Sequence, residues 1–138
     1  MTAFVNQLSG ARGSYDVVSV LSQVLTQLID INANSSRPSA PSPSVAPSLA
    51  KFQSSYAPTI SIHSYLSRIQ KYANLTPAVY TTTLIYIDRL IEATNLSLTP
   101  LNIHRLLLVA VVVATKFLQD DYYKNCYYAK LGKMGSNP

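Results

Sequence analysis

The sequence is poor in the residues from which most active sites are built. It has one cysteine, Cys126, and two histidines, His63 and His104. A zinc or iron site needs three or four ligands, and a single cysteine excludes a disulfide within the chain. The chain has four glycines, and none lies in a phosphate-binding fingerprint. We therefore expect no metal, no cofactor, no small-molecule substrate and no enzymatic activity.

Charged residues are also scarce. They make up 12% of the chain, about half the ~25% of an ordinary globular protein. The net charge is +5, but the basic residues are scattered from Arg12 to Lys133. A nucleic-acid surface would gather them on one face, so we predict no nucleic-acid partner. Asp88 and Glu92 lie four residues apart, and we interpret them as a solvated helix face and not as an acid–base pair. So little charge indicates either that a partner covers part of the exterior or that part of the chain is disordered and polar without being charged, and we expect both.

Long hydrophobic runs are absent too. The longest uninterrupted run, 106–114, has nine residues, whereas a membrane-spanning helix needs about 20. The N-terminal sequence MTAFVNQLSGARG lacks the basic start and apolar core of a secretory signal. Together with the single cysteine, this predicts an intracellular protein of the cytoplasm, the nucleus or both, with no membrane partner.

What the sequence does contain is a series of helix patterns. Apolar residues recur at helical spacing in 15–31, with Ser14 as the expected N-cap, and again in 60–74. The pairs Thr76-Pro77 and Thr99-Pro100 predict two further helix starts, because a capping threonine before a proline suits the first turn. No segment from residue 60 onward alternates at period two in a convincing way. The pattern predicts an all-α fold.

The most apolar of these segments is NIHRLLLVAVVVATKF, residues 102–117. A helix that is hydrophobic on all sides must be surrounded by other helices, so we expect it to form the centre of the bundle. Lys116 lies where this helix reaches the surface. Taken alone, a lysine there is typical of a cation that complements the helix dipole.

Two other segments have a different composition. Residues 32–48 are rich in Ser, Pro and Ala, which cannot bury enough apolar surface to offset the entropy of ordering. We predict a disordered linker over 32–57, after an N-terminal segment 1–31, and a flexible tail over 133–138. Between linker and tail, 58–132 forms the main domain. Near its end, the spacing of Tyr123 and Tyr127 predicts that they share one helical face.

The motifs of this main domain occur in a characteristic order. TISIHSYLSRIQKYANLTPAVY is followed by LIYIDRL, LNIHRLLLVAVVVATKF and QDDYYKNCYYAKLG. This series resembles the cyclin box of the P/U-type cyclins, the phosphate-signalling cyclins of fungi and their plant and protist relatives. The helix 15–31 resembles the helix that precedes the box in such cyclins. The resemblance implies a cyclin-box helical bundle around the apolar third helix.

The same resemblance implies a function and a site. A cyclin is the regulatory subunit of a cyclin-dependent protein kinase, and it holds the mobile αC helix of the kinase in the position that phosphoryl transfer requires. By the match to its TKF motif, Lys116 is the expected kinase-binding cation. Its expected neighbours at the kinase are Phe117, Asp120, Asp121, Tyr122 and Tyr123, and Asp88 and Arg105 are expected to be structural residues of the box.

The chain departs from the family pattern in two places. The stretch 59–64 has no arginine to pair with Asp88, so Arg105 is the alternative partner. The chain also ends at AKLGKMGSNP, where the family continues into a fifth helix, so we expect a partial box with three helices and part of a fourth. The alternative function is a cyclin-fold adaptor without kinase-activating ability, either a transcription or nucleic-acid assembly factor or a pseudo-cyclin fragment.

Overall fold

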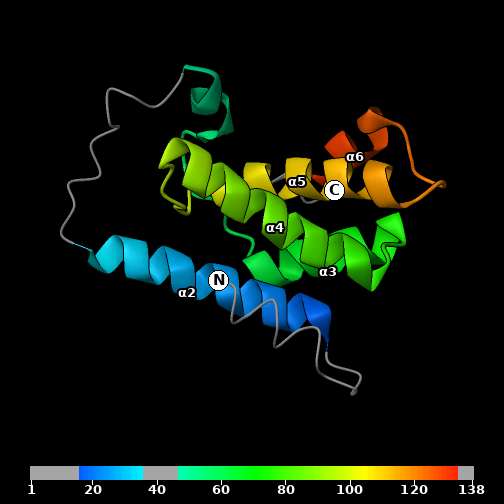
Figure 1. The fold of residues 1–138 in the computed structure, drawn as a ribbon, viewed down its shortest axis with the longest axis horizontal. Coiled ribbons are helices and arrows are strands. Elements are labelled where there is room, and N and C mark those ends of the chain that lie inside the picture. Colours follow the sequence, from blue (N-terminus) through cyan, green and yellow to red (C-terminus); the bar gives the residue numbers. More distant parts are fainter. Residues whose placement is uncertain (1–15, 36–46, 134–138) are drawn as a thin grey trace.

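The computed structural model describes residues 16–35 and 47–133, and within them every regular element is helical (Figure 1). This confirms the predicted all-α fold. No helix of the described part is long and apolar enough to cross a membrane. In chain order the elements are α2 (Val17–Asn34), the 3₁₀ helix η1 (Pro47–Phe52), α3 (Ile62–Ala73), α4 (Pro77–Thr94), α5 (Ile103–Leu118) and α6 (Asn125–Leu131).

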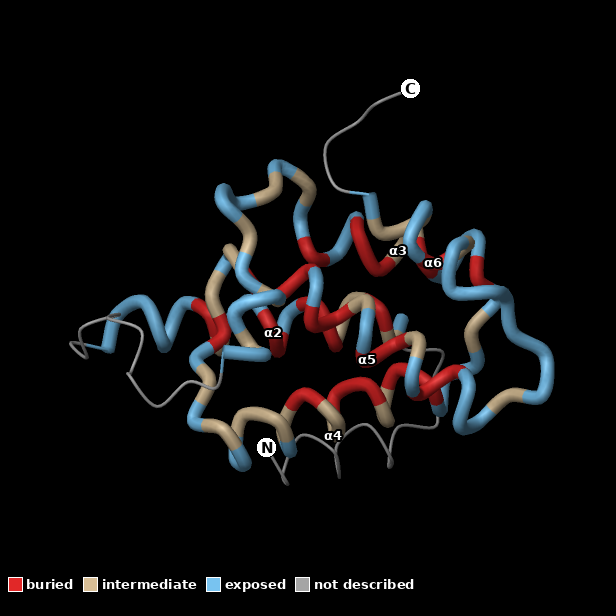
Figure 2. The backbone as a smooth tube through the Cα atoms, turned by 90° about the horizontal axis from the view of Figure 1, so that it is seen from above, coloured by how far each residue is buried: buried red, intermediate tan, exposed pale blue. Residues whose placement is uncertain are grey.

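Three of the other elements pack against α5. Helix α4 makes the most extensive contact with it, and α6 and η1 contact it as well, while α2 lies across α3 and α4. Buried positions line the inward faces of α3, α4 and α5 (Figure 2). Leu66, Leu107 and Val111 are fully buried, and burying a side chain of this size contributes about 1.5–3 kcal/mol. The hydrophobic effect of these faces therefore holds the bundle together.

One side of α5 is not covered by the described residues. Its inward face is buried through Leu107, Val111 and Ala114, but Val109 and Val113 are about half exposed on the other face. The prediction that neighbouring helices enclose this segment on every side is therefore wrong for that face. The reason is that α4, η1 and α6 flank α5 without closing over it.

Helix α2 begins and ends later than the sequence pattern predicted. The side chain of Asp16 caps it by accepting a hydrogen bond from the Val18 amide at 3.2 Å, so Asp16 takes the role that we expected for Ser14, which lies outside the described residues. At the other end the helix continues to Asn34. Asn32 helps to extend it, because its amide nitrogen donates to the carbonyl of Leu98 at 3.2 Å.

The predicted linker 32–57 therefore differs from the structure at both ends. Residues 32–34 belong to α2, and residues 47–52 form η1. Two hydrogen bonds from Arg105 hold η1 and the residues after it, with Nη1 donating to the carbonyls of Lys51 at 2.9 Å and Gln53 at 3.2 Å. Residues 36–46 and most of the predicted tail, 134–138, lie outside the described part of the chain.

The two Thr-Pro pairs have different outcomes. Helix α4 begins at Pro77 with Thr76 as N-cap, although the threonine side chain makes no capping hydrogen bond. Helix α5 begins only at Ile103, because Thr99 and Pro100 form a turn that precedes it. Asn102 closes this turn, as its Oδ1 accepts from the Thr99 amide at 2.9 Å.

Candidate functional site

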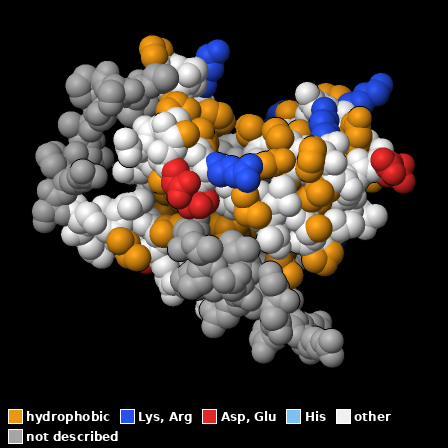
Figure 3. All heavy atoms as spheres, in the orientation of Figure 1, with side chains coloured by type: hydrophobic (Ala, Val, Ile, Leu, Met, Phe, Trp, Pro, Cys, Tyr) orange, Lys and Arg blue, Asp and Glu red, His pale blue; other side chains and the backbone are white. Residues whose placement is uncertain are grey.

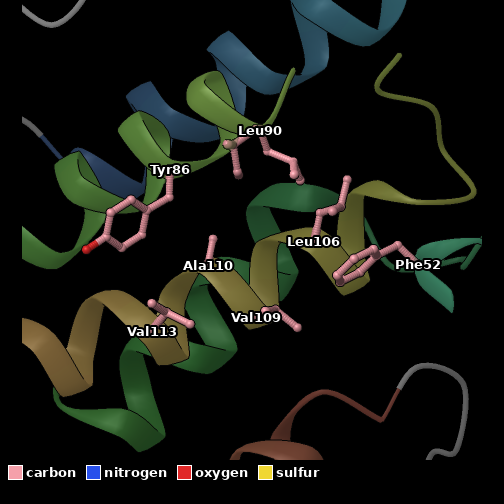
Figure 4. A pocket seen from close by; sticks show the side chains of 8 residues that line it. Phe52, Tyr86, Leu90, Leu106, Val109, Ala110 and Val113 are labelled. Carbon is pink, nitrogen blue, oxygen red and sulfur yellow. The ribbon is translucent and has the colours of Figure 1, made fainter. Parts of the chain in front are cut away.

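The uncovered side of α5 forms an apolar groove with α4. The groove has a volume of about 220 Å³. In Figure 4, Tyr86 and Leu90 approach it from α4, Val109 and Val113 from α5, and Phe52 from η1. Helical spacing explains this lining, since residues four apart lie on the same face of a helix. All the lining side chains are apolar or aromatic, so the groove suits an apolar ligand surface.

The groove continues as an exposed stripe along α5. Val109, Val113 and Phe117 follow one another at four-residue intervals and are 46%, 50% and 75% exposed. We call these three residues the α5 stripe. In Figure 3 the surface is hollowed between η1 and α6, and hydrophobic side chains gather around the hollow. Contiguous apolar patches of this kind mark interaction sites on soluble proteins.

Lys116 lies beside the stripe in the last turn of α5. Its ammonium group donates a hydrogen bond to Oδ1 of Asn125, the first residue of α6. The same Nζ lies 5.5 Å from the ring centroid of Tyr122, which is within the range of a cation–π interaction. The exposed lysine is therefore held in one direction, next to Phe117 and at the end of the groove.

Asp120, Asp121, Tyr122 and Tyr123 lie in the loop that joins α5 to α6. Tyr123 stacks on Tyr127 with ring centroids 4.1 Å apart, and its amide donates to the Tyr128 hydroxyl at 3.3 Å. Tyr123 and Tyr127 do not share one helical face as predicted, because Tyr123 precedes the start of α6. The structure thus brings all the predicted kinase-binding residues to the same end of α5.

Asp88 and Arg105 do not form the expected pair. Within residues 16–35 and 47–133, the basic and acidic side chains that approach each other are those of His63 and Asp16, with Nε2 and Oδ2 4.0 Å apart, and they form an ion pair only when the histidine is protonated. Arg105 turns instead toward the carbonyl groups at the end of η1. Because Phe52 of η1 lines the groove, Arg105 still has a structural role, which is to hold one wall of this site.

The histidines lie on different elements and belong to the scaffold. His63 is on α3, where its Nε2 is 3.2 Å from the Ser19 hydroxyl of α2. His104 is buried on α5, and its Nε2 donates to the carbonyl of Ile60 at 2.9 Å. Burial lowers the pKa of His104, although the hydrogen bond to Ile60 partly offsets this effect. In the described part of the chain, no three His, Cys, Asp or Glu residues lie close enough to hold a metal ion.

The sequence pattern missed several residues of this site. Asn125 was not predicted, because nothing in the sequence indicates that the loop returns its side chain to Lys116. Val109 and Val113 have the four-residue spacing of a stripe, but this signal is weak inside a helix that is apolar throughout. Phe52 lay in the predicted linker, so its place in the groove depends on η1.

Comparison with known proteins identifies the family. The cyclin family model matches residues 15–137 of the chain. The chain belongs to the cyclin family. The matched range of this cyclin includes α2, α3, α4, α5 and the short α6, and the division into three box helices and part of a fourth stays a prediction.

Plant U- and P-type cyclins are among its relatives, in agreement with the predicted type. Cyclin-U4-1 of Arabidopsis thaliana is 39% identical over 121 residues, which cover 87% of this chain and 58% of the relative. Cyclin-U2-2 of Arabidopsis thaliana is 36% identical over 121 residues, covering 86% and 52%. Cyclin-P2-1 of Oryza sativa subsp. japonica is 36% identical over 118 residues, covering 86% and 54%. The chain thus spans little more than half the length of these relatives.

Proposed function

We propose that this cyclin is a regulatory subunit that binds a cyclin-dependent protein kinase and positions the αC helix of that kinase. The observation that carries the proposal is the exposed apolar groove, which leads along α5 directly to an oriented cation, Lys116. Kinase activity depends on an ion pair between a strand lysine and a glutamate on αC, so a partner that fixes αC controls phosphoryl transfer.

The apolar part of the surface supplies the affinity in this proposal. The α5 stripe exposes three large side chains beside the groove. Covering each of them contributes at most about 1.5–3 kcal/mol, against the several kcal/mol that association costs in lost freedom. The stripe and the groove together are therefore needed for stable binding.

The polar part of the surface supplies specificity. The contact with Asn125 orients the ammonium group of Lys116 before binding, so less side-chain entropy is lost when a kinase carbonyl or carboxylate accepts from it. Tyr122 contacts the lysine, and Asp120, Asp121 and Tyr123 lie on the same loop before α6. A mixed rim of charges and aromatic side chains around an apolar centre is the usual arrangement of a protein interface.

The test is a binding measurement with purified cyclin-dependent protein kinases on the full chain and on three variants. Lys116→Ala removes the cation, and Val113→Asp places a charge in the stripe at a position that is half exposed. Lys130→Ala, which removes an exposed lysine from α6, is the matched control. Loss of a charged interface contact costs about 2 kcal/mol or more, so Lys116→Ala is expected to weaken binding ~30-fold or more.

Circular dichroism of each variant checks that the helices remain folded. Equal binding by Lys116→Ala and Lys130→Ala would remove Lys116 from the site, and unchanged binding by Val113→Asp would remove the stripe. Binding of none of the kinases by the unmodified chain would reject the function. Salt-sensitive binding of DNA or RNA in its place would favour the alternative, a cyclin-fold adaptor.

A further inference from the structure

The loop between α5 and α6 has the properties of a substrate for a modifying enzyme. Residues 119–124 form no helix, and all from Asp120 to Lys124 are exposed. A protein kinase needs a free hydroxyl group on a chain segment that can enter its cleft without unfolding a helix. Two tyrosines of the loop meet the first condition, with Tyr122 52% and Tyr123 44% exposed.

Contacts distinguish the two tyrosines. Tyr123 is stacked on Tyr127, and its amide is bonded to the Tyr128 hydroxyl. To reach a kinase cleft it would have to leave both contacts. The contact that the structure gives Tyr122 is the exposed ammonium group of Lys116, so this side chain can turn outward at little cost. Tyr56 is more exposed still, but the residues around it carry no charge that would steer an enzyme.

The charges around Tyr122 favour both its recognition and a response. Asp120 and Asp121 precede it directly, which suits a tyrosine kinase with a basic peptide groove. With Lys116 and Lys124 these aspartates give the neighbourhood a net charge near zero. A phosphate group adds about −1.5 to −2 charges, so the surface beside Lys116 would become strongly negative. Its oxygens are also stronger acceptors for an ammonium group than the neutral amide of Asn125.

We propose that Tyr122 is a phosphorylation site and that its phosphate pairs with Lys116. In the modification the phenolic oxygen attacks the γ-phosphorus of ATP, and the new oxygen–phosphorus bond forms as the bond to ADP breaks. The phenolic proton passes to the catalytic base of the modifying kinase. The consequence for binding rests on the proposed function: phosphorylation withdraws Lys116 from the cyclin-dependent kinase and prevents binding.

The site itself is tested without any cyclin-dependent kinase. The full chain is incubated with Mg-ATP and the catalytic domain of an acidic-directed protein tyrosine kinase, and the phosphate is mapped by tandem mass spectrometry. We expect Tyr122 to be modified at least tenfold faster than any other tyrosine. Tyr122→Phe should remove this product and Tyr123→Phe should leave its rate unchanged. Faster modification of Tyr123 or Tyr56, or no modification, overturns the site.

The pairing with Lys116 is tested by phosphorus NMR on the phosphorylated chain. A nearby cation favours the doubly charged phosphate, so its second ionisation should occur at lower pH in the parent chain than in Lys116→Ala. Identical titration curves overturn the pairing. In the binding assay, phosphorylation should weaken kinase binding at least tenfold, and undiminished binding overturns the switch. If neither form binds any kinase, the proposed function fails while the modification site stands.

Discussion

His104 gives a prediction in which the sign and size of a pH effect follow from the fold. Its side chain is buried, with the residue 5% exposed, and its ring meets the edge of Tyr65 with centroids 5.0 Å apart. The Nε2–H group donates to the carbonyl of Ile60, while Nδ1 has no partner among the described residues. Protonation would add a buried N–H group at Nδ1 with no acceptor. The folded state therefore favours the neutral ring.

This preference for the neutral ring sets the direction in which the free energy of unfolding changes with pH. The pKa of His104 in the folded chain is lowered from the ordinary value of 6.5, chiefly by burial. The unfolded chain then binds the proton more readily, so the free energy of unfolding decreases as the pH falls below about 6.5. If His104 stayed neutral in the folded state, the linkage relation would give a loss in the free energy of unfolding of at most about 1.4 kcal/mol at pH 5.5, compared with high pH. Above pH 7.5 this contribution is constant.

The assay is urea unfolding between pH 5.5 and 7.5, monitored by circular dichroism. His104→Gln is the informative variant, because glutamine can still donate to the Ile60 carbonyl but does not titrate. The parent chain should lose stability over this range, by at most about 1.4 kcal/mol from this group, and the variant should lose much less. The pKa of Asp16 is also lowered, mainly by its hydrogen bond from Ser19. Its contribution is lost only as the pH falls below the ordinary aspartate value, outside this window.

His63→Gln is the matched control, because His63 is largely exposed on α3. This variant should keep the pH dependence of the parent chain. Parallel profiles for the parent chain and His104→Gln would refute the argument, and so would a parent chain that gains stability as the pH falls.

Two further predictions concern polar groups of the scaffold. The Tyr80 hydroxyl is buried without a partner among the described residues, so Tyr80→Phe should leave the free energy of unfolding unchanged or raise it by up to about 1 kcal/mol. In contrast, Tyr128→Phe removes a hydrogen bond and should lower the free energy of unfolding by about 0.5–1.5 kcal/mol. Urea unfolding of both variants checks this, and a large loss in Tyr80→Phe contradicts it. Arg105→Ala removes two hydrogen bonds to the η1 segment and should speed amide exchange over residues 47–54 while Arg89→Ala does not. Equal exchange in both would show that Arg105 does not hold the segment.

Local signals in the sequence were sufficient for most of the helices. The structure has α3 and α4 at the predicted places because each has a strong apolar repeat and a clear end. Asn74 and Asn95 end them with positive φ angles of 50° and 53°, a conformation that asparagine tolerates better than most residues. The start of α5 was misplaced, since the Asn102 side chain that closes the preceding turn competes with the Thr-Pro signal.

The candidate site was predictable only in part. Family motifs pointed to Lys116 and its neighbours, which are adjacent in sequence, and their role at a kinase stays a prediction. The groove could not be found in the same way, because its walls come from η1, α4 and α5, which are far apart in sequence. The partner of Arg105 was also missed, since backbone carbonyl acceptors leave no trace in residue identity.

The amino-acid sequence by itself determined the helical class, the family and the position of the apolar segment, because periodicity, helix-ending residues and ordered motifs are local properties of the chain. Only the tertiary structure decided which side of α5 stays open, where Asn125 meets Lys116 and which tyrosine of the loop is free. A helix that is apolar all round has no contrast between its faces, so its exposed face depends on where the neighbouring helices pack.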